Sequence, residues 1–334
     1  MMRKLLKKLL FAFYLLVVTS IVLEIGVRLW GYSERHISDP IYMPFELTQE
    51  IPYVHKPNLV NARARGLAII NTDSLGLRAI ISGDRRATRQ DNEYRIAIVG
   101  DSMTFGEGVI KTEDTFPQVL EDILNQKQNT FRVKIFNFSA SAYSVQVMAA
   151  LLRYRMLDVE PDLVIMSIIP QDFDLSRTPS IDASGYLTDN KMSTLLPKDS
   201  SLRPLLRKVH LLYLLRDIIY PRLYNTKNDE DILWSDGLPQ SYSYIKQFAA
   251  TAGQHRIAYS IVLLPSQSSF MNIPAQLKQD QISSVDLSPL RDEFTQEQFQ
   301  ASSFDTHPSA QVHKRIGESL GEYILENRLM VSQK

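Results

Sequence analysis

The chain of 334 residues contains no cysteine, which excludes disulfide bonds and cysteine-ligated metal sites and leaves the redox compartment open. It also lacks an excess of charge of either sign, with 37 Lys and Arg residues against 37 Asp and Glu residues. A nucleic-acid-binding protein usually carries a basic excess, so no nucleic-acid partner is predicted. The hydrophobic content of 44% and the charged content of 22% are typical of a folded globular protein.

One long hydrophobic run is present, over residues 9–27 near the amino terminus. As a helix it would be roughly 28 Å long, close to the thickness of the hydrocarbon core of a bilayer. Residues 1–8 carry four positive charges, which predicts that this end lies in the cytoplasm and that the chain after residue 30 lies on the extracytoplasmic side of the cytoplasmic membrane. Glu24 is near enough to the far end of the run to reach the interface, where Trp30 and Tyr32 fit an aromatic belt.

Two other interpretations of this run are weaker. A cleaved signal peptide is disfavoured because the run is long and lacks a small-x-small cleavage site. An amphipathic or buried core helix is the remaining alternative. We predict an uncleaved single-pass anchor in residues 1–30, a stalk or lead-in segment over residues 31–92, and a larger domain over residues 93–330.

The most informative segment is RIAIVGDSMTFGEGV, residues 95–109. Ile96 to Val99 form a short apolar run rich in β-branched residues, which is typical of a strand buried on both faces of a parallel sheet. Gly100 permits a sharp turn, and Ser102 follows just beyond the carboxyl end of the strand, where open α/β sheets bind their ligands. A serine at this place is a candidate nucleophile if a histidine can take its proton.

A histidine with a neighbouring carboxylate occurs near the other end of the chain, in SFDTHPSAQVH, residues 303–313. With Ser102 as the nucleophile, His307 as the general base and Asp305 orienting the imidazole, the chain would hold a serine triad in the order Ser…Asp…His. His313 lies at the start of the following helix pattern and is interpreted as structural.

The GDS tripeptide at residues 100–102 and the D-x-H-P-S-A pattern at residues 305–310 together resemble the SGNH, or GDSL-type, hydrolase family in its membrane-anchored bacterial form. The resemblance implies a three-layer α/β/α sandwich and a serine esterase, and no cofactor is expected. The segment INTDSLGLR, residues 70–78, is similar to an N-x-x-G-x-R segment that precedes the hydrolase domain in anchored members, and we interpret it as structural.

The alternation of strand and helix patterns itself predicts an α/β fold with a parallel sheet and right-handed crossovers. About five strands in a flavodoxin-like order are expected. The expected strands are residues 96–99, 133–138, 163–169, 257–264 and 284–287, and the expected helices are residues 116–126, 145–157, 242–252 and 311–327.

The alternation is interrupted over about residues 174–240, a segment too long for a simple loop. Within it, residues 202–224 mix leucines with basic residues at helical spacing. This pattern favours an amphipathic helix packed on the domain, and its alternatives are a cap over the active site or a surface that lies back on the membrane. His210 in this helix is interpreted as a packing residue.

The resemblance also implies an oxyanion hole. In this family its donors are the backbone N–H of the serine, the N–H of a glycine after the second strand and an asparagine side chain after the third. Here these places correspond to Ser102, Ser139 and Gln171, so that serine replaces glycine and glutamine replaces asparagine. Serine keeps a backbone donor where the conformation does not need a positive φ. Glutamine keeps an amide donor about 1.5 Å further out, and a misplacement of about 1 Å can cost on the order of 100-fold in rate.

A metal site is a weaker interpretation of the same region. Asp101, Asp172, Asp305 and His307 would be its carboxylate-rich ligand set, but no H-x-x-x-H or similar ligand pair supports it. The triad explains the same residues, and no metal is predicted.

These observations predict a membrane-anchored serine esterase or deacetylase that acts outside the cytoplasmic membrane on an ester, such as the O-acetyl groups of a cell-envelope glycan. If a sugar hydroxyl resolved the same acyl-enzyme, the protein would be an O-acetyltransferase of an exopolysaccharide or wall glycan. A third alternative is a non-catalytic anchored binding or scaffold protein with a decayed oxyanion hole, an interpretation that Ser139 and Gln171 favour.

Overall fold

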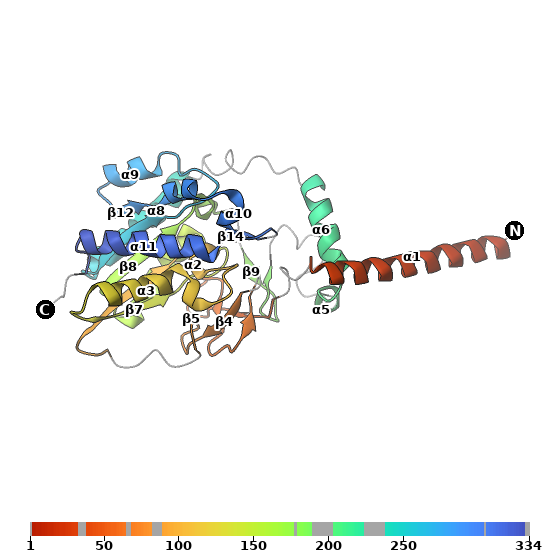
Figure 1. Cartoon of the computed structure of the whole chain (residues 1–334), viewed down its shortest axis with the longest axis horizontal. Coiled ribbons are helices and arrows are strands. Elements are labelled where there is room, and N and C mark those ends of the chain that lie inside the picture. The colour runs from red at the N-terminus through yellow and green to blue at the C-terminus, as the bar shows by residue number, and fades with distance from the viewer. Residues whose placement is uncertain are drawn as a thin grey trace.

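The computed structural model describes residues 2–32, 38–64, 68–81, 89–176, 179–188, 203–223, 238–303 and 305–330 (Figure 1). A parallel sheet of five strands lies at the centre of this part of the chain, in the order β7–β6–β8–β11–β12. Its strands are β6 (Glu93–Val99), β7 (Arg132–Asn137), β8 (Leu163–Ile168), β11 (Ala258–Leu263) and β12 (Ser284–Asp286). This flavodoxin-like order confirms the predicted α/β fold.

Helices cover both faces of the sheet (Figure 1). On one face, α3 (Phe116–Lys127) packs against α11 (Ala310–Glu326), and on the other face α4 (Val145–Tyr154) packs against α8 (Leu238–Gln254). Every residue of β6 is buried because alternate side chains enter the two cores: Ile96 and Ile98 enter one, and Ala97 and Val99 the other. Gly317 of α11 permits the close approach of α3, since a Cβ there would lie 2.8 Å from Val119 Cγ1.

The segment that precedes the sheet forms short antiparallel ladders. β1 (Tyr42–Met43) pairs with β2 (Val54–His55), and β3 (Ala62–Arg63), β4 (Ile69–Thr72) and β5 (Arg78–Ala79) form a second small sheet. Its apolar side chains, including Tyr53, Ile70 and Leu77, belong to the same buried cluster as Phe105 and Phe138 of the main domain. The described part of the lead-in therefore packs on the domain as part of its core.

The amino-terminal helix α1 (Met2–Trp30) projects away from the rest of the molecule (Figure 1). Over Arg3–Trp30 it is long and apolar enough to cross a membrane, and only 6% of its most apolar stretch is buried. A signal sequence near the amino terminus can meet the same criteria of length and composition, so these features alone do not decide between the two.

Two helices of the predicted insertion lie beside the end of α1 (Figure 1): α5 (Arg203–Leu206) and α6 (His210–Leu223). They account for most of the helix expected over residues 202–224. The hairpin of β9 (Ser180–Ile181) and β10 (Leu187–Thr188) precedes them. Residues 177–178, 189–202 and 224–237 of the insertion lie outside the described residues.

The observed bounds depart from the expected ones mainly at short elements. α4 ends at Tyr154 and is followed by the 3₁₀ turn η4 (Met156–Val159) rather than continuing to residue 157 as helix. The sequence patterns also missed several short elements: α9 (Ile273–Gln279), α10 (Gln296–Phe299), the 3₁₀ turns η3 (Thr112–Asp114), η5 (Pro170–Phe173) and η6 (Ser288–Glu293), and the hairpin of β13 (Gln300–Ser302) and β14 (Asp305–Pro308).

Candidate active site

Ser102 follows the carboxyl end of β6, in a turn that only glycine can begin. A Cβ at Gly100 would lie 2.1 Å from Thr104 Oγ1 and 2.7 Å from the carbonyl oxygen of Ser167, so any larger residue would displace the neighbouring strand or helix. Asp101 then caps the four-residue helix α2 (Ser102–Phe105), because its Oδ1 accepts the Met103 N–H at 2.9 Å. Ser102 therefore stands at the start of a helix.

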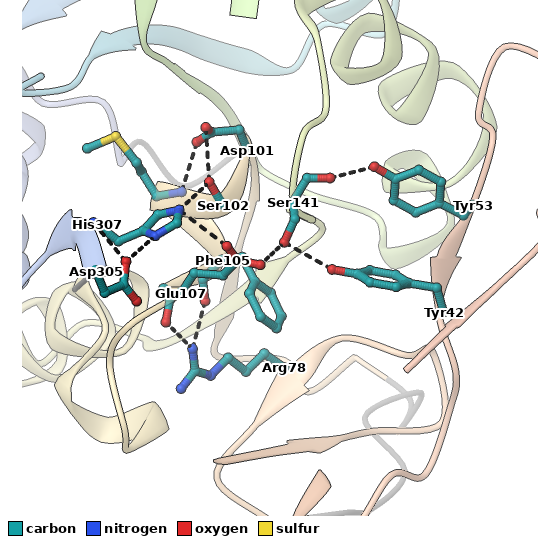
Figure 2. Close-up of polar contacts among 12 residues, drawn as sticks. Tyr42, Tyr53, Arg78, Asp101, Ser102, Phe105, Glu107, Ser141, Asp305 and His307 are labelled. Carbon is teal, nitrogen blue, oxygen red and sulfur yellow. Dashed lines mark hydrogen bonds and ion pairs between the residues drawn. The ribbon is translucent and has the colours of Figure 1, made fainter. Parts of the chain in front are cut away.

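The structure brings Ser102, His307 and Asp305 together (Figure 2). His307 Nε2 lies 3.0 Å from Ser102 Oγ, and His307 Nδ1 lies 2.6 Å from Asp305 Oδ1. Asp305 Oδ1 also accepts the backbone N–H of His307 at 3.1 Å. Both residues belong to β14, where side chains two positions apart point to the same face, so this strand sets the spacing of the histidine and its carboxylate.

A second carboxylate, which the sequence analysis did not single out, contacts the same histidine (Figure 2). Glu107 Oε2 lies 3.2 Å from His307 Nε2, and the residue is only 4% exposed. Its other oxygen accepts a hydrogen bond from the Ser141 hydroxyl. The Ser141 hydroxyl in turn accepts a hydrogen bond from the Tyr42 hydroxyl at 2.9 Å. A chain of polar contacts therefore runs from the lead-in segment to the histidine of the site.

The only sequence signal for Glu107 is its place in the segment GEG, after the nucleophile turn. Gly106 and Gly108 both have positive φ angles, 87° and 80°, which turn the chain back toward the site. At Gly108 a Cβ would lie 2.6 Å from the Cβ of Ala301 and 3.1 Å from Asp305 Oδ2. The two glycines thus let the loop pass close to β14 and place the Glu107 carboxylate beside His307.

Arg78, the last residue of the INTDSLGLR segment, holds this loop (Figure 2). Its buried guanidinium donates to the carbonyl oxygens of Phe105 at 3.0 Å, Gly106 at 2.7 Å and Val109 at 2.9 Å. Burial lowers the pKa of Arg78 to about 10, against the partly compensating charges of nearby glutamates, so the side chain stays charged at neutral pH. The segment interpreted as structural therefore bears directly on the position of Glu107.

The charges around His307 determine the proton affinity of its imidazole. Burial alone would lower the pKa of His307, but the hydrogen bond to Asp305 and the negative charges of Glu107, Asp305 and Asp101 outweigh burial. The pKa of His307 consequently lies above its ordinary value. His313, by contrast, is fully buried in α11 and accepts the Phe116 N–H at 3.1 Å on Nδ1, a structural role.

A cavity of about 180 Å³ opens beside Ser102 and His307. Four carboxylates line it: Asp101, Glu107, Asp172 and Asp174. No Lys or Arg occurs among the described residues of its wall. The cavity is thus small and acidic, and its lining is more polar than that of a typical drug-sized ligand site.

The loop after β7 differs from the sequence expectation. Ser139 does not line the cavity that contains Ser102, and its N–H donates to Asn137 Oδ1 at 3.1 Å. Ala142 does line the cavity, and its φ of 62° lies in the left-handed region that favours glycine. Ala142, unlike Ser139, therefore combines a positive φ with a place in the wall of the cavity.

Gln171 lies where the sequence placed it, in the 3₁₀ turn η5 that follows β8, and its side chain lines the cavity. Its Nε2 donates to Ser268 Oγ at 2.8 Å, while Oε1 is buried without a hydrogen-bond partner in the described part of the chain. Asp172 has a different task, because its Oδ2 accepts the Ile169 N–H at 2.9 Å and so braces the turn.

No protein-family model and no curated protein matches the chain. Solved structures similar to it include a lipolytic protein of the G-D-S-L family from Desulfitobacterium hafniense, 16% identical, with a TM-score of 0.42 over 68% of this chain and 98% of that one. A lipase/acylhydrolase from Enterococcus faecalis is 11% identical, with a TM-score of 0.41 over 72% and 100% of the two chains. A two-domain esterase active on acetylated mannans is 11% identical, with a TM-score of 0.40 over 72% and 52%.

These three structures are thus described as a lipolytic protein of the G-D-S-L family, a lipase/acylhydrolase and an esterase. Because the identities are low, we infer the activity of this chain from its own residues, above all from the contacts that join Ser102, His307 and Asp305.

Proposed function

We propose that the chain is a serine ester hydrolase in which Ser102, His307 and Asp305 form the catalytic triad. The observation that carries this proposal is the pair of contacts on one imidazole, 3.0 Å from Nε2 to Ser102 Oγ and 2.6 Å from Nδ1 to Asp305 Oδ1. In the neutral tautomer with the proton on Nδ1, Asp305 accepts a hydrogen bond from the Nδ1–H, and the Nε2 lone pair faces the serine hydroxyl. This is the arrangement that a general base needs before attack.

The reaction follows from these positions. Ser102 Oγ attacks the ester carbonyl carbon while its proton passes to His307 Nε2, and the tetrahedral intermediate carries the negative charge on the former carbonyl oxygen. Collapse breaks the bond to the alcohol oxygen, which takes the proton back from Nε2. Water then attacks the acyl group, gives a proton to Nε2, and the second collapse releases the acid and returns a proton to Ser102 Oγ.

The oxyanion would meet donors from three loops. The Ser102 N–H lies at the start of α2, and the second donor would be the N–H of Ala142, a residue of the cavity wall. Gln171 becomes the third donor if its side-chain amide is flipped, so that Oε1 and Nε2 exchange positions. Ser268 Oγ would then donate to Oε1, and the Nε2 group would occupy the place where an oxygen now lacks a partner. Each such donor is typically worth about 2.7–4 kcal/mol of transition-state stabilisation.

Glu107 is proposed as a positioning residue for His307. Once the imidazole is doubly protonated, its Nε2–H has a carboxylate acceptor 3.2 Å away in addition to the oxygen of the substrate. An imidazolium between Asp305 and Glu107 is stabilised by two negative charges, which favours the proton transfer from Ser102. The same charges raise the pKa of His307 in the resting protein, so the imidazole becomes neutral only at a higher pH.

The cavity supports a short acyl group on a polyhydroxylated alcohol as the substrate class. Its volume of about 180 Å³ is below the range of about 300–1,000 Å³ that drug-sized ligands occupy, which leaves little room for a long acyl chain. Its carboxylates can accept hydrogen bonds from sugar hydroxyls and would repel anionic esters. We propose an O-acetylated glycan of the cell envelope, reached from an uncleaved anchor in residues 9–27 with the domain on the extracytoplasmic side.

The test uses the full chain in detergent micelles. Hydrolysis of p-nitrophenyl acetate, butyrate and octanoate is compared for the wild-type chain and for Ser102→Ala, with Ser144→Ala as a matched control from the same cavity wall. The expected result is turnover that falls steeply with acyl length and that only Ser102→Ala abolishes. Equal turnover of octanoate would contradict the short-acyl proposal. Acetyl release only in the presence of a glycan acceptor, with acetylated acceptor as product, would replace hydrolysis by transfer.

A further inference from the structure

α6 exposes a stripe of aliphatic side chains that the rest of the described chain does not cover. Leu212, Leu215, Ile218 and Ile219 are 37% to 45% exposed. At 100° per residue these four side chains fall within an arc of about 120° on the helix. Tyr213 and Asp217 lie on the opposite side, and Arg216 lies beside the edge of the stripe, next to Leu212. The four exposed aliphatic side chains therefore share one side of α6.

α6 is fastened to α1 by polar contacts at the first turn of α6. Glu24 Oε1 accepts the His210 N–H at 3.0 Å, and Glu24 Oε2 accepts the Leu211 N–H at 2.7 Å. These are N–H groups that a helix cannot satisfy internally, and a carboxylate is favoured there. Arg28 donates to both Glu24 Oε1 and the Lys208 carbonyl oxygen, each at 2.7 Å.

A further contact joins the two helices beyond this point. The Tyr32 hydroxyl donates to Asp217 Oδ2 at 3.0 Å, so the polar side of α6 faces the end of α1. Figure 1 shows α6 running across α1 near its carboxyl end. A helix that lies across a membrane-spanning helix at one end runs along the membrane surface rather than through it.

Glu24 also marks where α1 leaves the lipid. It is the only acidic residue of α1, and a carboxylate in the hydrocarbon core costs several kcal/mol unless it is paired. Among the described residues its partners are Arg28 and the first N–H groups of α6, so this part of the structure belongs at the interface. The apolar stripe of α6 then lies at the same level as the end of the apolar surface of α1.

We propose that α6 is an interfacial helix that inserts Leu212, Leu215, Ile218 and Ile219 among the lipids of the outer leaflet. The partner is a lipid surface, because α6 packs against α1, whose own apolar side chains are exposed. The hydrolase domain is then held against the membrane at two places instead of turning freely on a single helix. This inference rests on the proposed uncleaved anchor.

The absence of cysteine makes the test direct, because each introduced cysteine is the only thiol in the chain. The full chain is reconstituted into phosphatidylcholine–phosphatidylglycerol vesicles with an NBD label at Leu215→Cys or, independently, at Ile218→Cys. Leu16→Cys in α1 reports on the anchor. Met271→Cys, which is 61% exposed just before α9, reports on a surface remote from α1 (Figure 1).

The expected result is that labels at positions 16, 215 and 218 are quenched by doxyl-labelled lipid and resist aqueous iodide, while the label at 271 behaves in the opposite way. If the label at 16 lies in lipid while those at 215 and 218 are quenched only by iodide, the result supports the membrane anchor but contradicts the proposal that α6 is an interfacial helix. If the labels on α6 resist both quenchers, a protein surface and not lipid covers the stripe, which also overturns the proposal. If the label at 16 is open to iodide, the anchor itself fails.

Discussion

His307 Nε2 lies between two oxygens, 3.0 Å from Ser102 Oγ and 3.2 Å from Glu107 Oε2 (Figure 2). The neutral imidazole accepts from the serine at this nitrogen, whereas the protonated imidazole can donate to the glutamate from the same nitrogen. The two contacts therefore belong to successive protonation states of one residue. The Ser141 hydroxyl and the Tyr42 hydroxyl behind it hold the glutamate in place.

The first prediction concerns the pH dependence of catalysis. The base acts only when His307 is neutral, and because its pKa is raised, kcat/KM for an acetyl ester falls as the pH drops through a value above the usual 6.5 or so. Glu107→Gln removes one negative charge beside the imidazole, so the pKa of His307 falls and this acid limb moves to lower pH, by about one unit.

The same variant should lower the plateau of kcat at high pH, because the imidazolium formed during attack loses a carboxylate. Ser141→Ala is the matched control, since it loosens Glu107 without removing its charge and should leave the acid limb near its original pH. If the low-pH limb of the kcat/KM profile does not shift in Glu107→Gln, the Glu107 carboxylate does not raise the pKa of His307.

The second prediction concerns the amide of Gln171. Gln171→Leu removes the donor but keeps a side chain of similar size, and kcat should fall by about 10²–10³-fold with little change in KM. Ser268→Ala removes the hydroxyl that would hold the amide in its donating orientation, so a smaller loss of kcat is expected. Gln171→Asn separates two cases: a loss means that the site is tuned to glutamine, and a large gain from near zero means that the oxyanion hole has decayed.

The third prediction concerns Arg78, which joins the lead-in to the loop that carries Glu107. Arg78→Lys keeps the charge but cannot reach three carbonyl oxygens at once, so we expect a loss of about 3 kcal/mol in unfolding free energy and a lower kcat. Arg153→Lys is the matched control, because its ion pair with Glu50 is about one-third exposed and should be worth little. Urea midpoints and kcat measured on the same preparations check both; equal midpoints for the two variants would contradict the proposed clamp.

The fourth prediction concerns stability in acid. Burial, with nearby arginine charges, lowers the pKa of His55 and of His313 to about 3, so both remain neutral in the folded protein while the unfolded chain protonates them below about 6.5. The unfolded state then binds more protons, and stability falls with decreasing pH by about 1.4 kcal/mol per pH unit for each histidine. The pKa of His307 is raised in the folded protein, so below about pH 6.5 this residue is protonated in both the folded and the unfolded state. Its contribution to the unfolding free energy is then constant, and it adds no slope in this window.

The measurement for this fourth prediction is the urea midpoint of the full chain in detergent at pH 6 and pH 5. His313→Asn keeps an acceptor for the Phe116 N–H and should lose about half of the pH-dependent change. An unchanged pH dependence in this variant would show that His313 is not a buried neutral histidine.

Much of the fold could be predicted from the sequence because strand and helix patterns are local. The buried runs of β6 and β8 and the serine just after a strand end need no tertiary information, and neither does the i, i+2 spacing of Asp305 and His307. Short elements such as α9 were not predicted because they are too short to show hydrophobic periodicity.

The remainder of the site depends on backbone conformation and on contacts between distant segments. Glu107 reaches His307 only because two glycines turn its loop toward β14, a strand that lies about 200 residues further along the chain. The loop after β7 is hard to interpret from the sequence for a related reason: it contains several small residues, and the positive φ that distinguishes Ala142 among them is a property of the folded backbone.

The most direct test of the proposed activity is the reaction of the full chain with a fluorophosphonate, followed by mass spectrometry of its peptides. A triad that functions should form one adduct, on Ser102, at a rate that falls when His307 is protonated, and His307→Ala should abolish it while the chain remains folded. A folded wild-type chain without an adduct, or with the same adduct rate in His307→Ala, would contradict the triad and favour a non-catalytic anchored protein.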